Sequence, residues 1–173
     1  PIWEHAMAAI SNGLAIHKLR PFCSTFFAFV DYLKPGIRMA GLAELPTVYI
    51  FSHDSIAVGE DGPTHHPIEQ LTMLRSIPNV DVIRPADANE TKEAYKIAFS
   101  KTNSPTCIVL SRQNMTAASS VSYEEFVKGA YIVKKENNHV DKTLIATGSE
   151  VNLAVDIAKI LEQRGFDVRV VSM

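Results

Sequence analysis

The sequence predicts an α/β fold in which a parallel sheet carries helices on both faces. Short apolar runs rich in β-branched and aromatic residues alternate with amphipathic segments at short spacing, which is the pattern of βαβ units. One such run, Val48–Phe51, leads directly into a polar, histidine-rich loop, as expected for a buried strand that ends at a ligand-binding edge. The length of 173 residues suits one large domain, or one domain and part of another.

The first elements follow from apolar spacing and from proline. Apolar residues recur at helical spacing over 4–18, and residues 22–24 are expected to form a short strand. Thr25 is a suitable N-cap, so a second helix is expected from there to about Tyr32 or beyond. We expect Pro35-Gly36 to interrupt this helix, which resumes over 37–42.

The middle of the chain continues the alternation. Residues 46–51 are an expected strand, and residues 67–77 are an expected helix. The apolar face of that helix is expected to consist of Ile68, Leu71, Leu74 and Ile77. The elements that follow are a strand over 80–83, a helix over 89–100 and a strand over 106–110. Together these elements give an expected first domain over residues 1–115.

The composition then changes. Residues 116–122 are rich in Ala, Ser and Thr without periodicity, so they are expected to form a linker. The expected elements beyond it are strands over 130–133, 143–146 and 168–171 and a helix over 150–164. The last three form one βαβ unit, and so few strands do not close a domain core. Residues 123–173 are therefore expected to be an incomplete second domain.

The loop after Phe51 concentrates titratable side chains around the turn Asp61-Gly62-Pro63. It is interpreted either as a ligand site at the edge of the sheet or as a solvated surface loop. His53, Asp61, His65 and His66 are zinc ligands by residue type, but their spacing matches no His-x-x-x-His pattern. A triad from His53, Asp54 and Ser55 is disfavoured, because consecutive side chains on an extended segment point to opposite sides.

Three further features each allow a structural and a functional interpretation, and the residue pattern leaves both open. Glu4 at a helix N-terminus either complements the helix dipole or is a carboxyl that passes protons from an apolar pocket. Phe26, Phe29 and Tyr32 either pack in the core or form a slot for a planar ring. Arg112 follows an expected strand, where it binds either a phosphate or a surface acid.

Composition excludes several classes of function. The net charge of −2 gives no electrostatic footprint for nucleic acid, and no apolar run approaches the ~18 residues of a membrane span. Cys23 and Cys107 lack metal-type spacing and fit a reducing, cytoplasmic location. The chain begins with Pro1 instead of Met, so we expect it to be a fragment of a longer protein.

Seven segments, in order over nearly the whole chain, resemble the transketolase family. The most specific is Gly59-Glu60-Asp61-Gly62-Pro63-Thr64-His65, because sister thiamine enzymes carry different residues there. The others are Glu4-His5-Ala6-Met7, Thr25-Phe26-Phe27 through Tyr32, His53-Asp54-Ser55, Arg84-Pro85-Ala86-Asp87, Ser111-Arg112-Gln113-Asn114 and Ala146-Thr147-Gly148-Ser149-Glu150-Val151. The resemblance implies a pyrimidine-binding (Pyr) domain over residues 1–115 and the start of the C-terminal domain over 123–173.

The resemblance also implies an activity and its partners. Transketolases are transferases of the pentose phosphate pathway that move a two-carbon ketol unit from a ketose phosphate to an aldose phosphate through thiamine diphosphate. A cytoplasmic homodimer with its active site between subunits is implied. Mg²⁺ or Ca²⁺ would be held with the diphosphate by a domain absent from this chain, which has no metal ligands of its own. The chain alone is therefore expected to be inactive.

The roles implied for individual residues are catalysis, cofactor binding and substrate binding. The catalytic residues would be Glu4, which contacts N1′ of the aminopyrimidine, and His65, which acts near the reacting carbons. Phe26, Phe29 and Tyr32 would join Glu4 in holding the pyrimidine ring. The substrate would be bound by His53 and Arg112 at its phosphate, by Asp61 at a hydroxyl, and by His65.

The chain departs from the family pattern at three expected loops. Pro1-Ile2-Trp3 stands where the family has Gly-Val-Arg, Cys23-Ser24 where it has Gly-Gly, and Met115-Thr116 where it has Leu-Pro. We hypothesise that residues are missing from the sequence there. The alternatives to a transketolase fragment are another thiamine enzyme, a non-catalytic domain that binds partners, and a zinc hydrolase built on the histidine loop.

Overall fold

The computed structural model describes residues 2–118 and 120–173. Pro1 and Ser119, which fall in the expected first domain and the expected linker, lie outside the described residues. The chain forms two compact units. The first consists of the chain up to Ile83 together with Tyr95–Gln113, and the second of Arg84–Ala94 together with Asn114–Met173.

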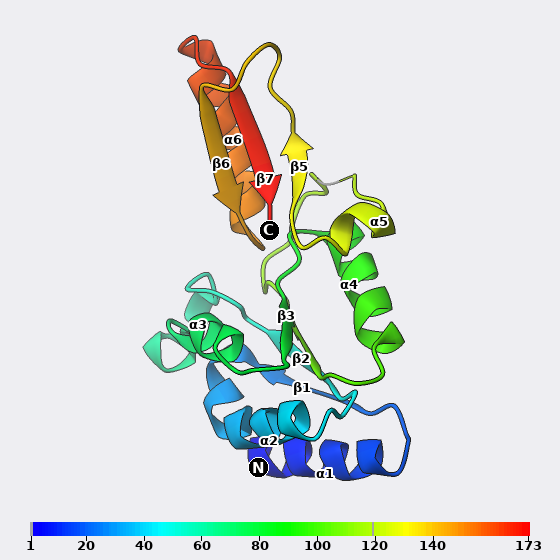
Figure 1. Ribbon diagram of the computed structural model, residues 1–173. Helices are drawn as coiled ribbons and strands as arrows, with labels where there is room; N and C mark the ends of the chain where they lie inside the picture. Colours follow the sequence, from blue (N-terminus) through cyan, green and yellow to red (C-terminus); the bar gives the residue numbers. More distant parts are fainter. Residues whose placement is uncertain (1, 119) are drawn as a thin grey trace. The chain divides into compact units, whose positions relative to one another are not determined.

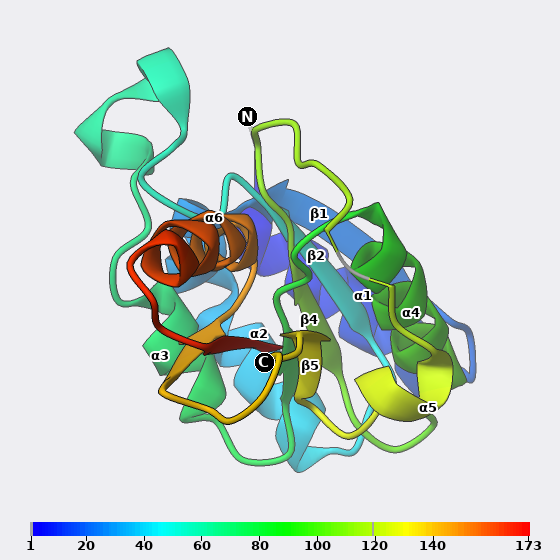
Figure 2. The same ribbon diagram turned by 90° about the horizontal axis from the view of Figure 1, so that it is seen from above.

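The first unit is built on a four-stranded sheet in which every pair of neighbouring strands is parallel (Figure 1). Its strands are β1 (Phe22–Phe26), β2 (Val48–Ser52), β3 (Asp81–Ile83) and β4 (Thr106–Val109), in the order β1-β2-β4-β3. Its helices are α1 (Glu4–Ile16), η1 (Phe27–Phe29), α2 (Val30–Leu42), η2 (Gly59–Asp61), η3 (Pro63–His65) and α3 (Gln70–Arg75). Helix α4 (Ala88–Ser100) begins in the second unit and ends in the first. The view from above shows β1, β2 and β4 side by side (Figure 2).

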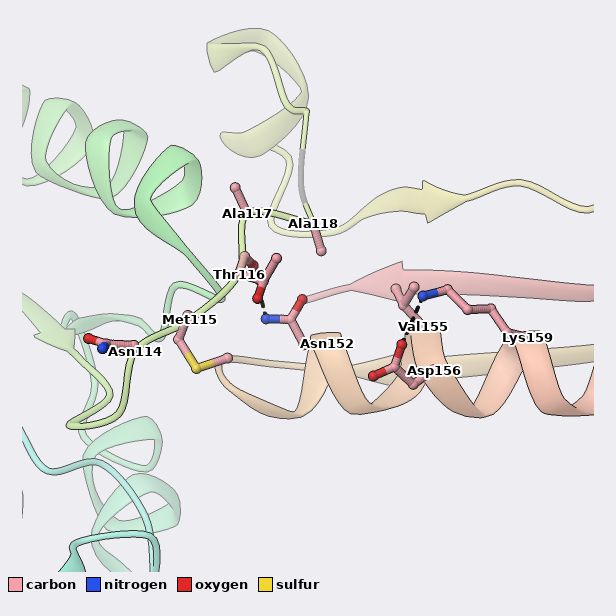
Figure 3. A pocket seen from close by; sticks show the side chains of 9 residues that line it. All are labelled: Asn114, Met115, Thr116, Ala117, Ala118, Asn152, Val155, Asp156 and Lys159. Carbon is pink, nitrogen blue, oxygen red and sulfur yellow. Dashed lines mark hydrogen bonds and ion pairs between the residues drawn. The ribbon is translucent and has the colours of Figure 1, made fainter.

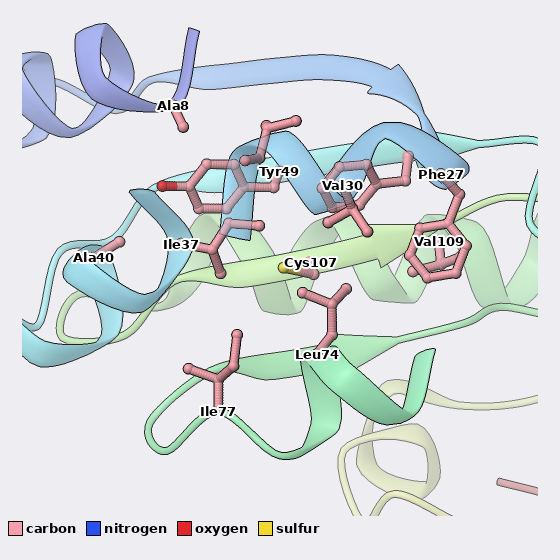
Figure 4. Close-up of a cluster of buried hydrophobic side chains, with 12 residues drawn as sticks. Ala8, Phe27, Val30, Ile37, Ala40, Tyr49, Leu74, Ile77, Cys107 and Val109 are labelled. Atoms are coloured by element: carbon pink, nitrogen blue, oxygen red, sulfur yellow. The ribbon is translucent and has the colours of Figure 1, made fainter. Parts of the chain in front are cut away.

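One face of this sheet packs against α1, α2 and α3. Tyr49 of β2 pairs in register with Cys107 of β4, and both are fully buried. The core on this face consists of Ala8, Phe27, Val30, Leu33, Ile37, Ala40, Tyr49, Phe51, Leu74, Ile77, Cys107 and Val109 (Figure 4). Burial raises the pKa of the Cys107 thiol well above its usual range, so this thiol stays protonated.

The opposite face of the sheet is covered by the end of α4. Cys23 of β1 packs against the core just described, so its neighbour Phe22 points to the other face. The Phe22 ring meets the ring of Phe99 edge to face, with centroids 6.5 Å apart. Helices therefore cover both faces of a parallel sheet, which confirms the predicted fold class.

The prediction for residues 25–42 was wrong in two respects. Thr25 does not cap a helix, because β1 runs on to Phe26 and Thr25 pairs with Phe51. Helix α2 is not interrupted at Pro35 but continues through it. Its apolar face, which includes Leu33 and Ile37, is buried against the sheet, and this packing outweighs the local preference of proline.

The helix expected over 67–77 is shorter than predicted, since α3 spans only Gln70–Arg75. Leu71 and Leu74 pack against the core as expected. Ile68 precedes the helix and is 73% exposed, so its placement on the apolar face was wrong. The other predicted strands and helices of the first unit are present, with ends within about two residues of those expected.

Helices α1 and α2 pack closely at Gly36. A Cβ atom on Gly36 would lie 2.6 Å from the Cβ of Ala8, whereas a Cβ on Gly13 of α1 would meet nothing within 4 Å. The Asn12 amide donates to the Gly36 carbonyl at 2.8 Å, so the two backbones are held together here.

Gly36→Ala is expected to destabilise the chain by about 1–3 kcal/mol, because the added methyl forces α1 away from α2. Gly13→Ala is the matched control and is expected to stabilise by up to about 1 kcal/mol through helix propensity alone. Urea unfolding of the two variants would measure both effects. Equal stabilisation by both would show that the helices have room to separate.

The second unit contains a three-stranded sheet, one long helix and one short helix. Its strands are β5 (Tyr131–Lys134), β6 (Lys142–Ala146) and β7 (Val168–Ser172), in the order β5-β7-β6, and its helices besides the start of α4 are α5 (Tyr123–Phe126) and α6 (Glu150–Gln163). Strands β6 and β7 are parallel and α6 joins and covers them, which confirms the predicted βαβ unit (Figure 1). Strand β5 runs antiparallel to β7.

Helix α5 was missed by the sequence analysis, although it carries a recognisable signal. The Ser122 hydroxyl accepts from the backbone N–H of Glu125, and the Glu125 carboxylate accepts from the N–H of Ser122. This reciprocal arrangement is a capping box, which Ser-x-x-Glu in the sequence predicts.

A buried carboxylate in the first turn of α4 connects residues 84–94 to the rest of the second unit. Glu90 is 2% exposed and accepts hydrogen bonds from the Tyr131 and Ser172 hydroxyls, each at 2.6 Å, and from the Ala86 N–H at 2.8 Å. Arg84 donates to the Thr147 carbonyl at 3.0 Å. Residues 84–94 are thus fixed to β5, β7 and the loop before α6. Among the helices of the described residues, none has the length and apolar character needed to cross a membrane.

Candidate functional site

The candidate site includes Phe26 and His53, which lie at the carboxyl ends of β1 and β2. Phe26 is the last residue of β1 and pairs in register with Ser52, the residue before His53. His53 adopts a left-handed backbone conformation with φ of 62°, an uncommon state for a residue other than glycine. Its imidazole stacks on the Phe26 ring with centroids 3.8 Å apart. The end of the parallel sheet therefore carries an imidazole with one face covered by an aromatic ring.

The loop after β2 brings a second imidazole to the same ring. His65, at the end of η3, meets Phe26 with centroids 6.1 Å apart and Phe29 with centroids 5.0 Å apart, both edge to face. The Thr64 hydroxyl lies 2.8 Å from His65 Nδ1, a neighbour that the sequence analysis did not single out. Gly62 makes the turn into η3 with φ of 77°. His53 and His65 are thus gathered around Phe26.

Asp61 lies near His53, and Arg112 contacts the loop that carries Asp61. Asp61 Oδ2 is 3.9 Å from His53 Nε2, the outer limit of an ion pair. A Cβ atom on Gly59 would lie 3.3 Å from the guanidinium carbon of Arg112, so this side chain lies over the Gly59 backbone. Gly59 has φ of 79°, so both its conformation and this close approach favour glycine. The loop that carries Asp61 is therefore in contact with Arg112, which follows β4.

Phe29 and Tyr32 form a stacked pair beside the imidazoles. Their ring centroids are 6.3 Å apart, with an angle of 23° between the planes. Tyr32 is 60% exposed, so this ring surface is open to a ligand. Phe26, Phe29 and Tyr32 do not share one helical face, because they lie in β1, η1 and α2. The strand-to-helix turn brings them together instead.

The position of Glu4 relative to the candidate site follows from the directions of α1 and β1. It is the first residue of α1, and its side chain is partly exposed. The chain runs along α1 away from the N-terminus and returns along β1, which packs on α1 (Figure 1). Glu4 therefore lies toward the carboxyl end of β1.

The two alternative interpretations of the histidine loop gain no support from the geometry. Within residues 2–118 and 120–173, no three His, Cys, Asp or Glu side chains lie close enough together to hold a metal ion. In the run His53-Asp54-Ser55, the Ser55 hydroxyl accepts from the Ala57 N–H, and the Asp54 carboxylate accepts from Ser111. Both of these bonds are made to residues outside the run.

A separate hollow of about 450 Å³ lies in the second unit, between the linker and α6 (Figure 3). The Asn152 amide donates to the Thr116 carbonyl across it at 3.0 Å. Its lining consists of Asn114, Met115, Thr116, Ala117, Ala118, Asn152, Val155, Asp156 and Lys159. It contains no residue of the predicted site, which lies wholly in the first unit.

The first unit is an α/β domain in which rings and imidazoles gather at the carboxyl ends of a parallel sheet, the edge at which ligands bind in open α/β sheets. Comparison with known proteins gives the family. The model of the transketolase pyrimidine binding domain matches residues 1–117, and that of the transketolase-like C-terminal domain matches residues 129–173. The chain belongs to the transketolase family.

Individual relatives agree with this assignment. A transketolase from Bacillus subtilis is 53% identical over 175 residues, covering 98% of this chain and 26% of the relative. A transketolase from Pichia stipitis in complex with sedoheptulose-7-phosphate superposes with a TM-score of 0.93 at 45% identity, covering 98% of this chain and 25% of that one. A structure described as a split gene transketolase, inactive β4 tetramer, superposes with a TM-score of 0.85 at 29% identity. The match covers 99% of this chain and 55% of that one.

The chain spans about a quarter of the length of the curated relatives that it matches. Alignments of 171 to 175 positions cover 98% of its 173 residues, so they leave room for only a few inserted residues.

Proposed function

We propose that this chain supplies the pyrimidine-binding half of a thiamine diphosphate site, and part of the sugar-phosphate channel, in a transketolase. The protein as a whole transfers a two-carbon ketol unit from a ketose phosphate to an aldose phosphate. The observation that carries the proposal is the gathering of Phe26, His53 and His65 at the carboxyl end of the sheet. A solved relative in the same family is described as a complex with a sugar phosphate.

The residues present fit the cofactor's pyrimidine ring. The stacked pair Phe29 and Tyr32 offers an aromatic surface that is open at Tyr32, and a planar heterocycle packs well on such a surface. When bound, thiamine diphosphate supplies the electron sink for making and breaking the carbon–carbon bond. The carboxyl of Glu4 would share a proton with ring nitrogen N1′ and so orient the aminopyrimidine.

The residues that would bind the substrate are assigned by their charge and position. The guanidinium of Arg112 and the imidazole of His53 would bind the phosphate of the sugar, since both donate hydrogen bonds to anions. Asp61 would accept a hydrogen bond from a sugar hydroxyl. His65, packed between Phe26 and Phe29, would donate to or accept from the oxygens near the reacting carbons.

The proposal extends to the parts of the protein beyond this chain. The diphosphate and its Mg²⁺ or Ca²⁺ would be held by a different domain, and a homodimer would place the two halves of the site together. We also propose a cytoplasmic location, which the two free thiols Cys23 and Cys107 support.

Donor preference of the full-length protein tests this proposal against another thiamine enzyme. With thiamine diphosphate and Mg²⁺ present, kcat/KM for a ketose phosphate is expected to exceed that for a 2-oxo acid by about 10- to 100-fold, because charge-assisted bonds to the phosphate are lost with the oxo acid. Omission of the cofactor should abolish both reactions. A preference for the oxo acid would assign the protein to another class of thiamine enzyme.

A further inference from the structure

The two residues proposed to bind the substrate's phosphate follow adjacent strands of the sheet. His53 comes directly after β2, and Arg112 comes shortly after β4. These strands are parallel neighbours, with Phe51 opposite Val109, and the Leu110 N–H donates to the Phe51 carbonyl at 2.7 Å. The sheet ladder therefore ends just before both residues, and beyond it side-chain bonds between the two loops can set their separation.

One side-chain hydrogen bond joins the loops at this point. The Ser111 hydroxyl donates to Asp54 Oδ2 at 3.2 Å. Asp54 is 6% exposed, so the carboxylate is screened from water and the bond to it is stronger than at the surface. Asp54 is the residue after His53, and Ser111 is the residue before Arg112. The bond thus connects the immediate neighbours of both phosphate-binding candidates.

Other contacts restrict the movement of the His53 and Arg112 side chains. The His53 ring is stacked on Phe26 at 3.8 Å, and its backbone is in the left-handed region. The Arg112 guanidinium lies over Gly59. With these contacts in place, a change in the separation of the two loops moves the imidazole and the guanidinium relative to each other.

We propose that Asp54 and Ser111 are positioning residues, which set the separation of His53 and Arg112 so that both can bind one phosphate group. The inference rests on the proposed function, because it takes the assignment of these two side chains to the sugar phosphate. Neither Asp54 nor Ser111 is proposed to contact the substrate.

The same type of bond at the other end of the sheet provides a matched control. The Ser104 hydroxyl donates to Asp81 Oδ2 at 3.1 Å, where β3 and β4 begin. Ser104→Ala removes a serine-to-aspartate bond of the same kind, far along the strands from the candidate site. Asp81 also pairs with Lys101 at 3.0 Å, so this variant controls for the loss of the serine hydroxyl and not for the burial of the acid.

The experiment compares Ser111→Ala, Ser111→Thr and Ser104→Ala in the full-length protein with two donors, a ketose phosphate and the unphosphorylated ketose of the same carbon chain. Ser111→Ala is expected to raise KM for the phosphorylated donor about 5- to 10-fold, because one charge-assisted contact to phosphate is misaligned. Its kcat and its KM for the unphosphorylated donor should change less than about twofold. Ser111→Thr, which keeps the hydroxyl, and Ser104→Ala should behave as the wild type.

Equal changes in KM for the two donors, or no change with either, would overturn the inference. If Ser111→Ala does not fold, Asp54→Asn provides the same test, because it keeps an acceptor but removes the charge, and a smaller rise confined to the phosphorylated donor is expected. A wild-type protein without ketol transfer would instead overturn the proposed function, and the inference with it.

Discussion

Glu4→Gln in the full-length protein is expected to lower kcat by about 10²- to 10⁴-fold and to leave the fold intact. The proposed role of Glu4 is to share a proton with the pyrimidine ring, and removing an acid–base group typically has an effect of this size. The amide is nearly the same shape as the carboxyl but cannot hold the proton. A steady-state ketol-transfer assay would measure the loss, and circular dichroism would report the fold.

The competing explanation of Glu4 is that its charge only complements the dipole of α1. In that case, neutralisation would cost up to about 1 kcal/mol of stability and would leave turnover unchanged. Glu124 lies in the first turn of α5 and provides the control. Glu124→Gln should show only the small effect on stability, and full activity in Glu4→Gln would remove the catalytic role.

The central strands β2 and β4 were predictable from the sequence because they are largely buried. Each contains a continuous apolar run, Val48–Phe51 in β2 and Cys107–Val109 in β4, and this pattern depends little on tertiary context. The turn from β1 to α2 was mispredicted because its structure depends on tertiary contacts. Thr25 and Pro35 carry strong local preferences, but pairing with Phe51 and packing of the α2 face decided the structure there.

The resemblance to the family supplied the members of the candidate site, and neither it nor the residue pattern gave their geometry. The residue types after Phe51 indicated a ligand-binding loop, yet the stacking of His53 on Phe26 depends on the register that pairs Phe26 with Ser52. Nothing local to either residue specifies that register. The bond from Ser111 to Asp54 was missed for the same reason, since 57 positions separate the two residues.

The role of residues 84–94 also could not be predicted from local pattern. The sequence indicates a strand, a turn and a helix, which read as a continuous part of the first domain. The buried carboxylate of Glu90 binds Tyr131 and Ser172 instead, from strands that lie 41 and 82 positions further along the chain. Such a contact requires the tertiary structure, because a Glu on a helix is ordinarily a surface residue.

The 173-residue chain by itself is expected to show no measurable ketol transfer, with or without added thiamine diphosphate and Mg²⁺. The proposed site in this chain holds the pyrimidine ring and the sugar phosphate, but it offers no group of metal ligands among the described residues. Without the metal, the charged diphosphate has no strong partner, and the reactive ring is not held against the substrate.

Mixing experiments would separate an incomplete site from a misfolded chain. The proposed diphosphate-binding domain of the full-length protein would be purified separately and titrated into this chain, with the cofactor and metal in excess. Ketol transfer should appear only in the mixture, and a chain carrying Glu4→Gln should fail to restore it. Because the two halves of the site must meet for reaction, the rate should rise with the concentration of either part and then saturate. Turnover by the chain alone would contradict the division of the site, since all the catalytic groups would then have to lie within these 173 residues.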